Sequence, residues 1–194
     1  MNRKLLRGRP GVLDDAALVN LINAARQRNH VHARRDHALL VLLANVGMRP
    51  GEAVRLVRED LHFKGDRSWI RIRRLKKRRA RGVIDDLPIS VPVAHTLEQY
   101  LRRCVPPRPA APLFPVSVRQ TERLFRYYAR RAGLPGEAHL YWLRHTAATR
   151  LYRSCHDLRL VQAQLGHERL ETTSIYAHID PEQLRRAAAA VSVT

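Results

Sequence analysis

Cysteine is scarce in this chain, and long apolar runs are missing. The 194 residues include two cysteines, Cys104 and Cys155, too few for a disulfide framework, so a reducing compartment is expected. No stretch approaches the roughly 18 consecutive apolar residues that a membrane-spanning helix needs. The basic first ten residues lead into Gly11 and an acidic pair, not into an apolar segment, so no signal peptide is expected. These features predict a bacterial cytoplasmic protein.

Metal-binding patterns are also missing. The ten histidines and two cysteines show no grouping with the spacing of a zinc site, and Cys155-His156 alone is a poor signal. We therefore expect neither a metal site nor a cofactor.

Acidic residues are outnumbered two to one. There are 36 Lys and Arg against 17 Asp and Glu, a formal charge of +19, and the sequence pI is near 11.4. Such a charge is typical of a nucleic-acid-binding protein associated with the nucleoid. An Arg-rich composition inherited from a GC-rich genome is the alternative. Binding to a membrane surface is disfavoured, because no segment pairs a basic face with a broad aromatic-rich apolar face.

Apolar residues at helical spacing predict helices over most of the chain. Leu18, Leu21 and Ala25 follow the N-cap pair Asp14-Asp15. A second helix is predicted over 34–44, ended by Gly47, and a short third helix over 51–57, with Pro50 in its first turn. Further helices are predicted after Pro92 and over 117–132, 140–153, 157–165, 168–178 and 182–190.

A small sheet is predicted in the middle of the chain. Trp69-Ile-Arg-Ile-Arg73 alternates with period two, and residues 83–90 are a plausible partner strand, with the basic stretch between them at the hairpin tip. The predicted class is mainly α with a small antiparallel β-sheet. The chain is predicted to form one domain over 1–194, with a basic arm over 1–12 and a Pro-rich connection over 105–115 between two halves.

Four segments carry residues suited to phosphate chemistry. They are Gly47-Met-Arg49-Pro-Gly-Glu52, the basic hairpin, Tyr141-Trp-Leu-Arg144-His-Thr and Leu165-Gly-His167…Tyr176. In this order they resemble the boxes of the tyrosine recombinase (phage integrase) family, and the layout is closest to its small fimbrial-switch DNA invertases. The last segment is the most specific, because it fixes six positions within twelve residues.

The resemblance implies a site-specific recombinase that cuts and rejoins double-stranded DNA. Tyr176 is then the nucleophile, which forms a 3′-phosphotyrosine intermediate. Arg49 and Arg144 would hold the non-bridging phosphate oxygens, since a guanidinium makes bidentate, charge-assisted hydrogen bonds. His167 would donate a further hydrogen bond. Integration, excision and inversion all remain open.

The family places its general-acid lysine in the hairpin. By resemblance Lys76 takes this role, and Lys77 is the alternative because adjacent residues in a strand point to opposite sides. The surrounding side chains are expected to contact the DNA backbone together with Lys77: Arg73, Arg74, Arg78, Arg79 and Arg81.

Two features depart from the family pattern. Tyr141 stands where the family usually has His, and a tyrosine with a pKa near ~10 is a poor base. Tyr141 is therefore expected to donate a hydrogen bond to the phosphate. The first arginine box also begins near residue 47, and the basic arm and short helical stretch before it leave no room for the core-binding domain that most family members carry. The chain is thus either a lone catalytic domain or one separated from a core-binding domain.

Assembly and rival functions follow from the same resemblance. Family members act as four protomers on DNA, and the helix over 181–190 would dock on a neighbouring protomer or pack on its own domain. A type IB topoisomerase-like enzyme shares the chemistry, and a non-catalytic DNA-binding regulator shares the fold. The first would relax supercoils, and the second would form no covalent adduct.

Overall fold

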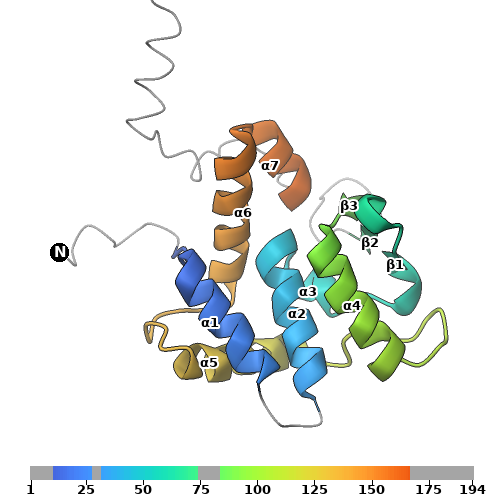
Figure 1. The fold of residues 1–194 in the computed structure, drawn as a ribbon, viewed down its shortest axis with the longest axis horizontal. Helices are drawn as coiled ribbons and strands as arrows, with labels where there is room; N and C mark the ends of the chain where they lie inside the picture. The colour runs from blue at the N-terminus through green and yellow to red at the C-terminus, as the bar shows by residue number, and fades with distance from the viewer. Residues whose placement is uncertain (1–10, 28–31, 74–83, 167–194) are drawn as a thin grey trace, which may run out of the picture.

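The computed structural model describes residues 11–27, 32–73 and 84–166 of the chain, as a helical body with a small sheet at one side (Figure 1). The helices are α1 (Asp15–Arg26), α2 (Ala33–Val46), α3 (Pro50–Ala53), α4 (Val91–Cys104), α5 (Val118–Arg131), α6 (Tyr141–Cys155) and α7 (Leu158–Leu165), with 3₁₀ turns η2 (Arg58–Asp60) and η3 (Gly65–Arg67). The predicted class, mainly α with a small antiparallel sheet, is confirmed. No described helix is long and apolar enough to cross a membrane.

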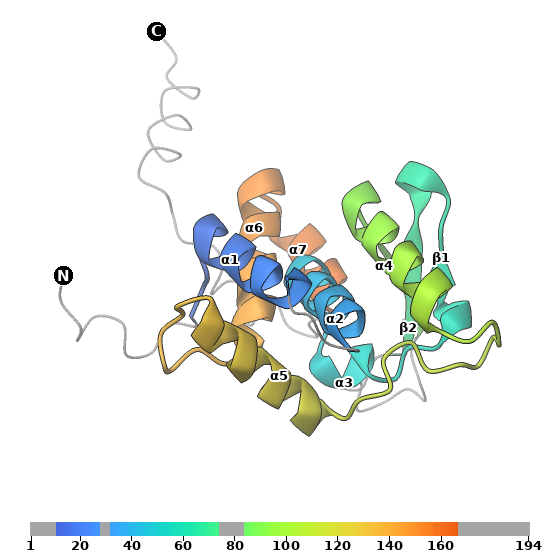
Figure 2. The ribbon, with the colours of Figure 1, turned by 60° about the horizontal axis from the view of Figure 1, so that its bottom comes forward.

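Helix α2 is the centre of the body. Its leucines, Leu39, Leu40, Leu42 and Leu43, are fully buried, and α1, α4 and α6 pack around it (Figures 1 and 2). A helix that is apolar on most sides needs partners on most sides, so the sequence of α2 requires this central position. The Asp14 side chain accepts a hydrogen bond from the Ala17 N–H at 2.7 Å, which confirms the predicted start of α1.

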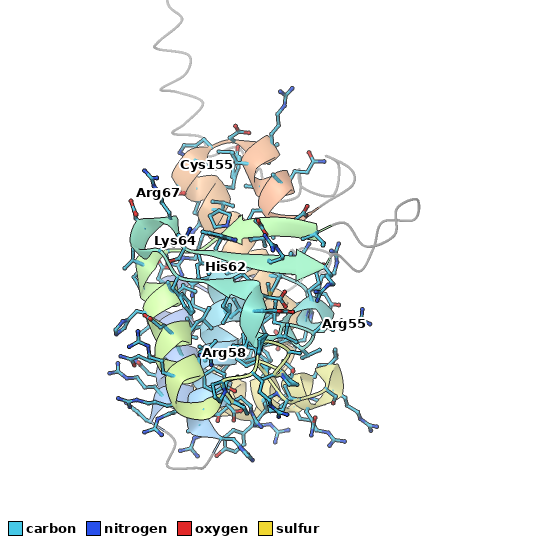
Figure 3. The ribbon with its side chains drawn as sticks, turned by 90° about the vertical axis from the view of Figure 1, so that its right-hand side faces the viewer. Arg55, Arg58, His62, Lys64, Arg67 and Cys155 are labelled. Atoms are coloured by element: carbon cyan, nitrogen blue, oxygen red, sulfur yellow. The ribbon has the colours of Figure 1, made fainter. Side chains whose placement is uncertain are left out.

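The sheet has the order β1 (Leu61–His62), β2 (Trp69–Arg73) and β3 (Ile84–Pro88), and all its pairs are antiparallel. Ile70 and Ile72 are buried, whereas Arg71 and Arg73 are exposed, as period-two alternation predicts. The connection between β1 and β2 carries Lys64 and Arg67 and lies at one end of the sheet (Figure 3). At this end the His62 ring stacks on the Trp69 ring, with centroids 4.7 Å apart.

The third helix is shorter than predicted. It ends at Ala53 and not at Val57, because the following residues pair with the Pro-rich connection. The Leu113 N–H donates to the Leu56 carbonyl at 2.8 Å, and Val57 forms a β-bridge with Pro112. Long-range pairing thus competes successfully with continuation of the helix.

The Pro-rich connection over 105–115 packs into the core. Val105, Ala111, Leu113 and Phe114 are buried in the same apolar cluster as α1, α2 and α4. The Tyr100 hydroxyl donates to the Leu113 carbonyl at 2.8 Å. The two halves that this stretch connects therefore share one core.

Residues just before α1 lie against α6. The Leu13 N–H donates to the buried Thr146 hydroxyl oxygen at 2.9 Å. Gly11 passes so close to the Trp142 ring that a Cβ atom there would overlap it. The end of the predicted basic arm thus contacts the helix that carries Arg144.

Candidate active site

Arg144 lies at the meeting point of three helices. It is 6% exposed on the inner side of α6. Its Nη1 donates to the Gly47 carbonyl at 2.6 Å, and its Nη2 donates to the Leu165 carbonyl at 2.9 Å. One guanidinium therefore joins the first arginine box, the second arginine box and the start of the Leu-Gly-His box.

Both carbonyls belong to helix C-termini. Gly47 ends α2 in the left-handed conformation (φ 70°), and Leu165 is the last residue of α7, followed by the left-handed Gly166 (φ 65°). Carbonyl groups at a helix C-terminus lack intrahelical partners and carry partial negative charge. A cation is favoured at such a position, so the two helix ends stabilise the buried charge of Arg144.

Two features require glycine at position 47: the neighbouring side chains leave no room for a Cβ atom, and the backbone is in the left-handed conformation. A Cβ atom at this position would lie 2.9 Å from the Leu165 Cδ2 and 3.1 Å from the Ala147 Cβ. The φ of 70° is also costly for residues with a side chain. Helices α2, α6 and α7 can thus approach closely enough for Arg144 to bridge them.

Arg49 follows two residues later and is held by Glu52. Its backbone N–H donates to Glu52 Oε2 at 2.8 Å, and its Nη1 lies 3.1 Å from Glu52 Oε1. The Glu52 side chain is fully buried, whereas the Arg49 side chain is 20% exposed. A buried carboxylate therefore fixes both the backbone and the guanidinium of Arg49, and part of that side chain still faces solvent.

Tyr141 is the first residue of α6 and is 47% exposed. It lies one helical turn before Arg144. His139, just outside the helix, packs edge-on against the Trp142 ring, with centroids 5.9 Å apart. Burial lowers the pKa of the half-buried His145, and His139 and Arg144 lower it further, so His145 is neutral near pH 7.

Several predicted site residues lie outside the described residues. They are His167, Tyr176, Lys76, Lys77, Arg74, Arg78, Arg79 and Arg81. Arg73 is described and is exposed at the end of β2, paired with Ile84 across the sheet. The structure thus brings together Arg49, Arg144 and the residues that directly precede His167. Among the described residues, no cluster of three or more His, Cys, Asp or Glu side chains is suited to a metal ion.

The family assignment comes from comparison with known proteins. The model of the phage integrase family matches residues 12–183, nearly the whole chain. This chain belongs to the phage integrase family. The integrase-family chain is 34% identical over 195 residues to the tyrosine recombinase XerC of Methylobacterium sp. (strain 4-46), covering 95% of this chain and 59% of that relative. It therefore spans well under two thirds of the length of this curated relative.

Solved structures support the same assignment. XerH recombinase bound to a palindromic difH substrate, in a post-cleavage complex, superimposes with a TM-score of 0.78 at 25% identity, over 97% of this chain and 55% of that one. XerA recombinase superimposes with a TM-score of 0.73 at 26% identity, over 96% and 66%. The fold of this integrase-family chain is that of tyrosine recombinases.

One candidate DNA-contacting surface was missed by the sequence reasoning. The apolar pattern over 117–132 predicts helix α5, and the spacing of its arginines is the signal that identifies this surface. Arg119, Arg123, Arg126 and Arg130 are all exposed, and their separations of four, three and four residues place them on one helix face. The opposite face buries Phe125 and Tyr128. Helix α5 packs against α1 and α3, and α3 belongs to the first arginine box, so in this integrase-family chain the arginine row lies on the outer face of a helix that contacts this box (Figure 2).

Proposed function

We propose that this chain is a site-specific DNA recombinase, which cuts and rejoins duplex DNA through a 3′-phosphotyrosine on Tyr176. One observation carries the proposal: buried Arg144 binds the Gly47 and Leu165 carbonyls and so joins three segments that are far apart in sequence. The relatives named tyrosine recombinase support it, although the chain spans only part of their length. The buried position of Arg144 provides the low-dielectric setting in which a guanidinium stabilises phosphate charge strongly.

Arg49 and Arg144 bind the two non-bridging oxygens of the scissile phosphate. Negative charge on these oxygens grows as the phosphorus becomes pentacovalent, and fixed guanidinium groups stabilise it without rearranging. Glu52 holds Arg49, and two helix ends hold Arg144. His167, two residues after Leu165, donates a further hydrogen bond to the phosphate.

The chemical step exchanges one phosphate ester for another. The Tyr176 hydroxyl oxygen attacks phosphorus, and the bond between phosphorus and the 5′ oxygen breaks. Lys76 gives the leaving 5′ oxygen a proton. The proton of the Tyr176 hydroxyl passes to His167, to solvent or to the phosphate, because Tyr141 is a poor base. Rejoining reverses these transfers and needs no energy source, since the ester bond is conserved.

Two basic surfaces hold the DNA. The first is the exposed arginine row of α5. The second is the hairpin after Arg73, with Arg74, Lys77, Arg78, Arg79 and Arg81 on the sugar-phosphate backbone. Four protomers act together on two DNA sites, with the segment over 181–190 docked on a neighbour.

A suicide DNA substrate tests the proposal. Inverted repeats beside the gene would supply the recombination site. A nick near the scissile phosphate lets the cleaved strand diffuse away, so the covalent adduct accumulates and appears as a shifted band on a denaturing gel. We expect the wild type to form the adduct and Tyr176→Phe to form none.

The controls separate chemistry from binding. Tyr176→Phe should retain DNA affinity, because phosphate contacts dominate the interface. Tyr152→Phe, a change of the same kind at a half-buried tyrosine of α6, should form the adduct normally. An undiminished adduct from Tyr176→Phe would reject Tyr176 as nucleophile. No adduct from the wild type on its own site would favour a non-catalytic regulator.

A further inference from the structure

Helix α6 is held on two opposite faces. Arg144 lies on one of them, and its guanidinium binds the carbonyls at the ends of α2 and α7. Trp142 and Thr146 lie two residues to either side of Arg144, and at about 3.6 residues per turn they are rotated by about 160° from it. The chain that leads into α1, residues 11–14, lies against this second face, so α6 is enclosed between that segment and the two helix ends (Figures 1 and 2).

The contacts of the 11–14 segment follow one stripe of α6. The stripe consists of three residues at intervals of four: Trp142, Thr146 and Arg150. Gly11 passes so close to the Trp142 ring that a Cβ atom would overlap it. The Leu13 N–H donates to the Thr146 hydroxyl oxygen at 2.9 Å. Asp15, the first residue of α1, lies 3.5 Å from the Arg150 guanidinium. Every second residue of an extended chain thus meets every fourth residue of a helix, two spacings that both advance about 6–7 Å.

The hydrogen bond between Leu13 and Thr146 is the buried contact of this stripe. Thr146 has no exposed surface, and Leu13 is 5% exposed. A buried N–H that loses its acceptor keeps the full cost of leaving water, so this bond resists any movement of the segment away from α6. The pair of Asp15 and Arg150 is exposed on both sides and contributes little. Thr146 is therefore the α6 residue that fixes the segment.

We propose that Thr146 is a positioning residue for Arg144 and that it acts by fastening the 11–14 segment to α6. The inference rests on the proposed role of Arg144 at the scissile phosphate. Because protein interiors are closely packed, a segment fastened to one face of α6 keeps the opposite face against α2 and α7. When the segment is released, α6 is free to move away from the Gly47 and Leu165 carbonyls, and the guanidinium moves with it. A displacement of about 1 Å is enough to slow a chemical step by about 10²-fold.

Two substitutions at position 146 separate the hydroxyl from the shape of the side chain. Thr146→Val removes the acceptor and keeps the volume, whereas Thr146→Ser keeps the acceptor. Single-turnover cleavage of the suicide substrate is measured at saturating DNA, at a temperature where urea unfolding shows every variant to be folded. We expect Thr146→Val to lower the cleavage rate at least about tenfold, with duplex affinity changed less than about twofold. Thr146→Ser should restore the rate to within about threefold of the wild type.

NMR of the arginine side chains gives a readout that does not depend on cleavage. A guanidinium held by two carbonyls rotates slowly and exchanges its protons slowly with water, so Arg144 should give separate Nη signals in the isotope-labelled full chain. Their loss in Arg144→Lys identifies them. We expect these signals to broaden or merge in Thr146→Val and to stay unchanged in Thr146→Ser. Gly11→Ala, which pushes the same segment off Trp142 without changing a residue of α6, should broaden them too.

Thr149→Val is the matched control. Thr149 is a buried threonine of the same helix, 8% exposed, and its hydroxyl makes no hydrogen bond to the described 11–14 segment. The change should alter the cleavage rate less than about twofold and leave the Arg144 signals in place.

Three results would overturn the inference. The first is wild-type cleavage with unchanged Arg144 signals in Thr146→Val. The second is reduced cleavage in Thr146→Val while the Arg144 signals stay unchanged. The third is a loss of cleavage in Thr149→Val as large as in Thr146→Val, which would reduce the effect to general damage of the core. If the wild type forms no adduct while the Arg144 signals still broaden in Thr146→Val, the proposed recombinase activity fails and the positioning of Arg144 by Thr146 stands.

Discussion

At the scale of single residues, Arg144 combines a structural and a proposed chemical role. Its guanidinium satisfies carbonyls at the ends of α2 and α7, and the same group is proposed to bind the scissile phosphate. Arg49 is held in a similar way, but its partner is the buried carboxylate of Glu52 and not a pair of backbone carbonyls. Each arginine is thus held in place before DNA binds, which is the condition for stabilising a transition state without rearrangement.

Arg144→Ala should reduce stability as well as cleavage. The change leaves two helix-end carbonyls without their charged donor, so we expect the free energy of unfolding to fall by about 2–4 kcal/mol. Urea unfolding measures this. Arg153→Ala, at an exposed arginine of the same helix, should change stability by less than about 0.5 kcal/mol. Equal stability of the two variants would show that the carbonyl contacts of Arg144 contribute nothing to the fold.

Tyr141→Phe should reduce cleavage only modestly. Tyr141 is half exposed, so the fold does not depend on its hydroxyl, and the expected loss is that of one hydrogen bond to a charged group, about 1–3 kcal/mol in the barrier. Single-turnover cleavage of the suicide substrate gives the rate. Tyr141→His should be as fast or faster near pH 7, because imidazole can accept a proton there. If Tyr141→Phe is as inactive as Arg144→Ala, the tyrosine has an essential role in proton transfer.

At the scale of elements, the site depends on how closely α2, α6 and α7 approach. Gly47 ends α2, and Ala147 and Leu165 lie where a side chain at position 47 would be. Gly133, after α5, has nearly the same φ (71° against 70°) but no atom within 4 Å of its missing side chain. Alanine substitutions at Gly47 and Gly133 therefore separate two losses of stability: the loss due to the left-handed backbone, which both share, and the loss due to close helix packing, which occurs only at position 47.

Gly47→Ala should therefore be more destabilising than Gly133→Ala. Both variants adopt a left-handed conformation, which costs about 1–2 kcal/mol. Only Gly47→Ala also forces α6 and α7 away, which adds about 1–3 kcal/mol. Urea unfolding gives both values, and Gly47→Ala should also slow cleavage, since the Gly47 carbonyl moves with Arg144. Equal losses of stability would mean that the helices can separate freely at this point.

At the scale of the whole molecule, the charge of +19 governs association with DNA. Described arginines are exposed along α5 and also near the ends of α1, α2 and α4, at Arg26, Arg34 and Arg103, so positive charge occurs on more than one side. Helix α5 contacts α3, which directly follows Arg49.

Binding to duplex DNA should be strongly dependent on salt. If roughly 6–10 phosphates are neutralised, affinity should fall ~10³–10⁵-fold between about 50 and 200 mM salt. Fluorescence anisotropy with a labelled duplex measures the slope. Arg123→Glu/Arg130→Glu should make that slope shallower. The matched control Arg34→Glu/Arg103→Glu, at two exposed arginines of α2 and α4, should leave it nearly unchanged. A flat dependence in the wild type would mean that the charge serves another purpose.

The sequence by itself determined most of the described helices, the strand over 69–73 and the family. These follow from local signals, because capping residues, apolar periodicity and motif spacing act within a few turns of the chain. The predicted start at Asp14, the stop at Gly47 and the strand over 69–73 agree with the structure. The roles of Tyr176, His167 and Lys76 stay predictions from the family motifs.

Only the tertiary structure decided what holds the site together. The carbonyl partners of Arg144 are 97 and 21 residues away in sequence, and nothing local to Arg144 identifies them. The early end of α3 and the buried Pro-rich connection also depend on pairing between distant residues. The sequence contains the arginine spacing of α5, but it does not show that α5 packs against α3. Hydrogen bonds and packing between distant segments form only when the whole core closes, so they decide which of the local possibilities is realised.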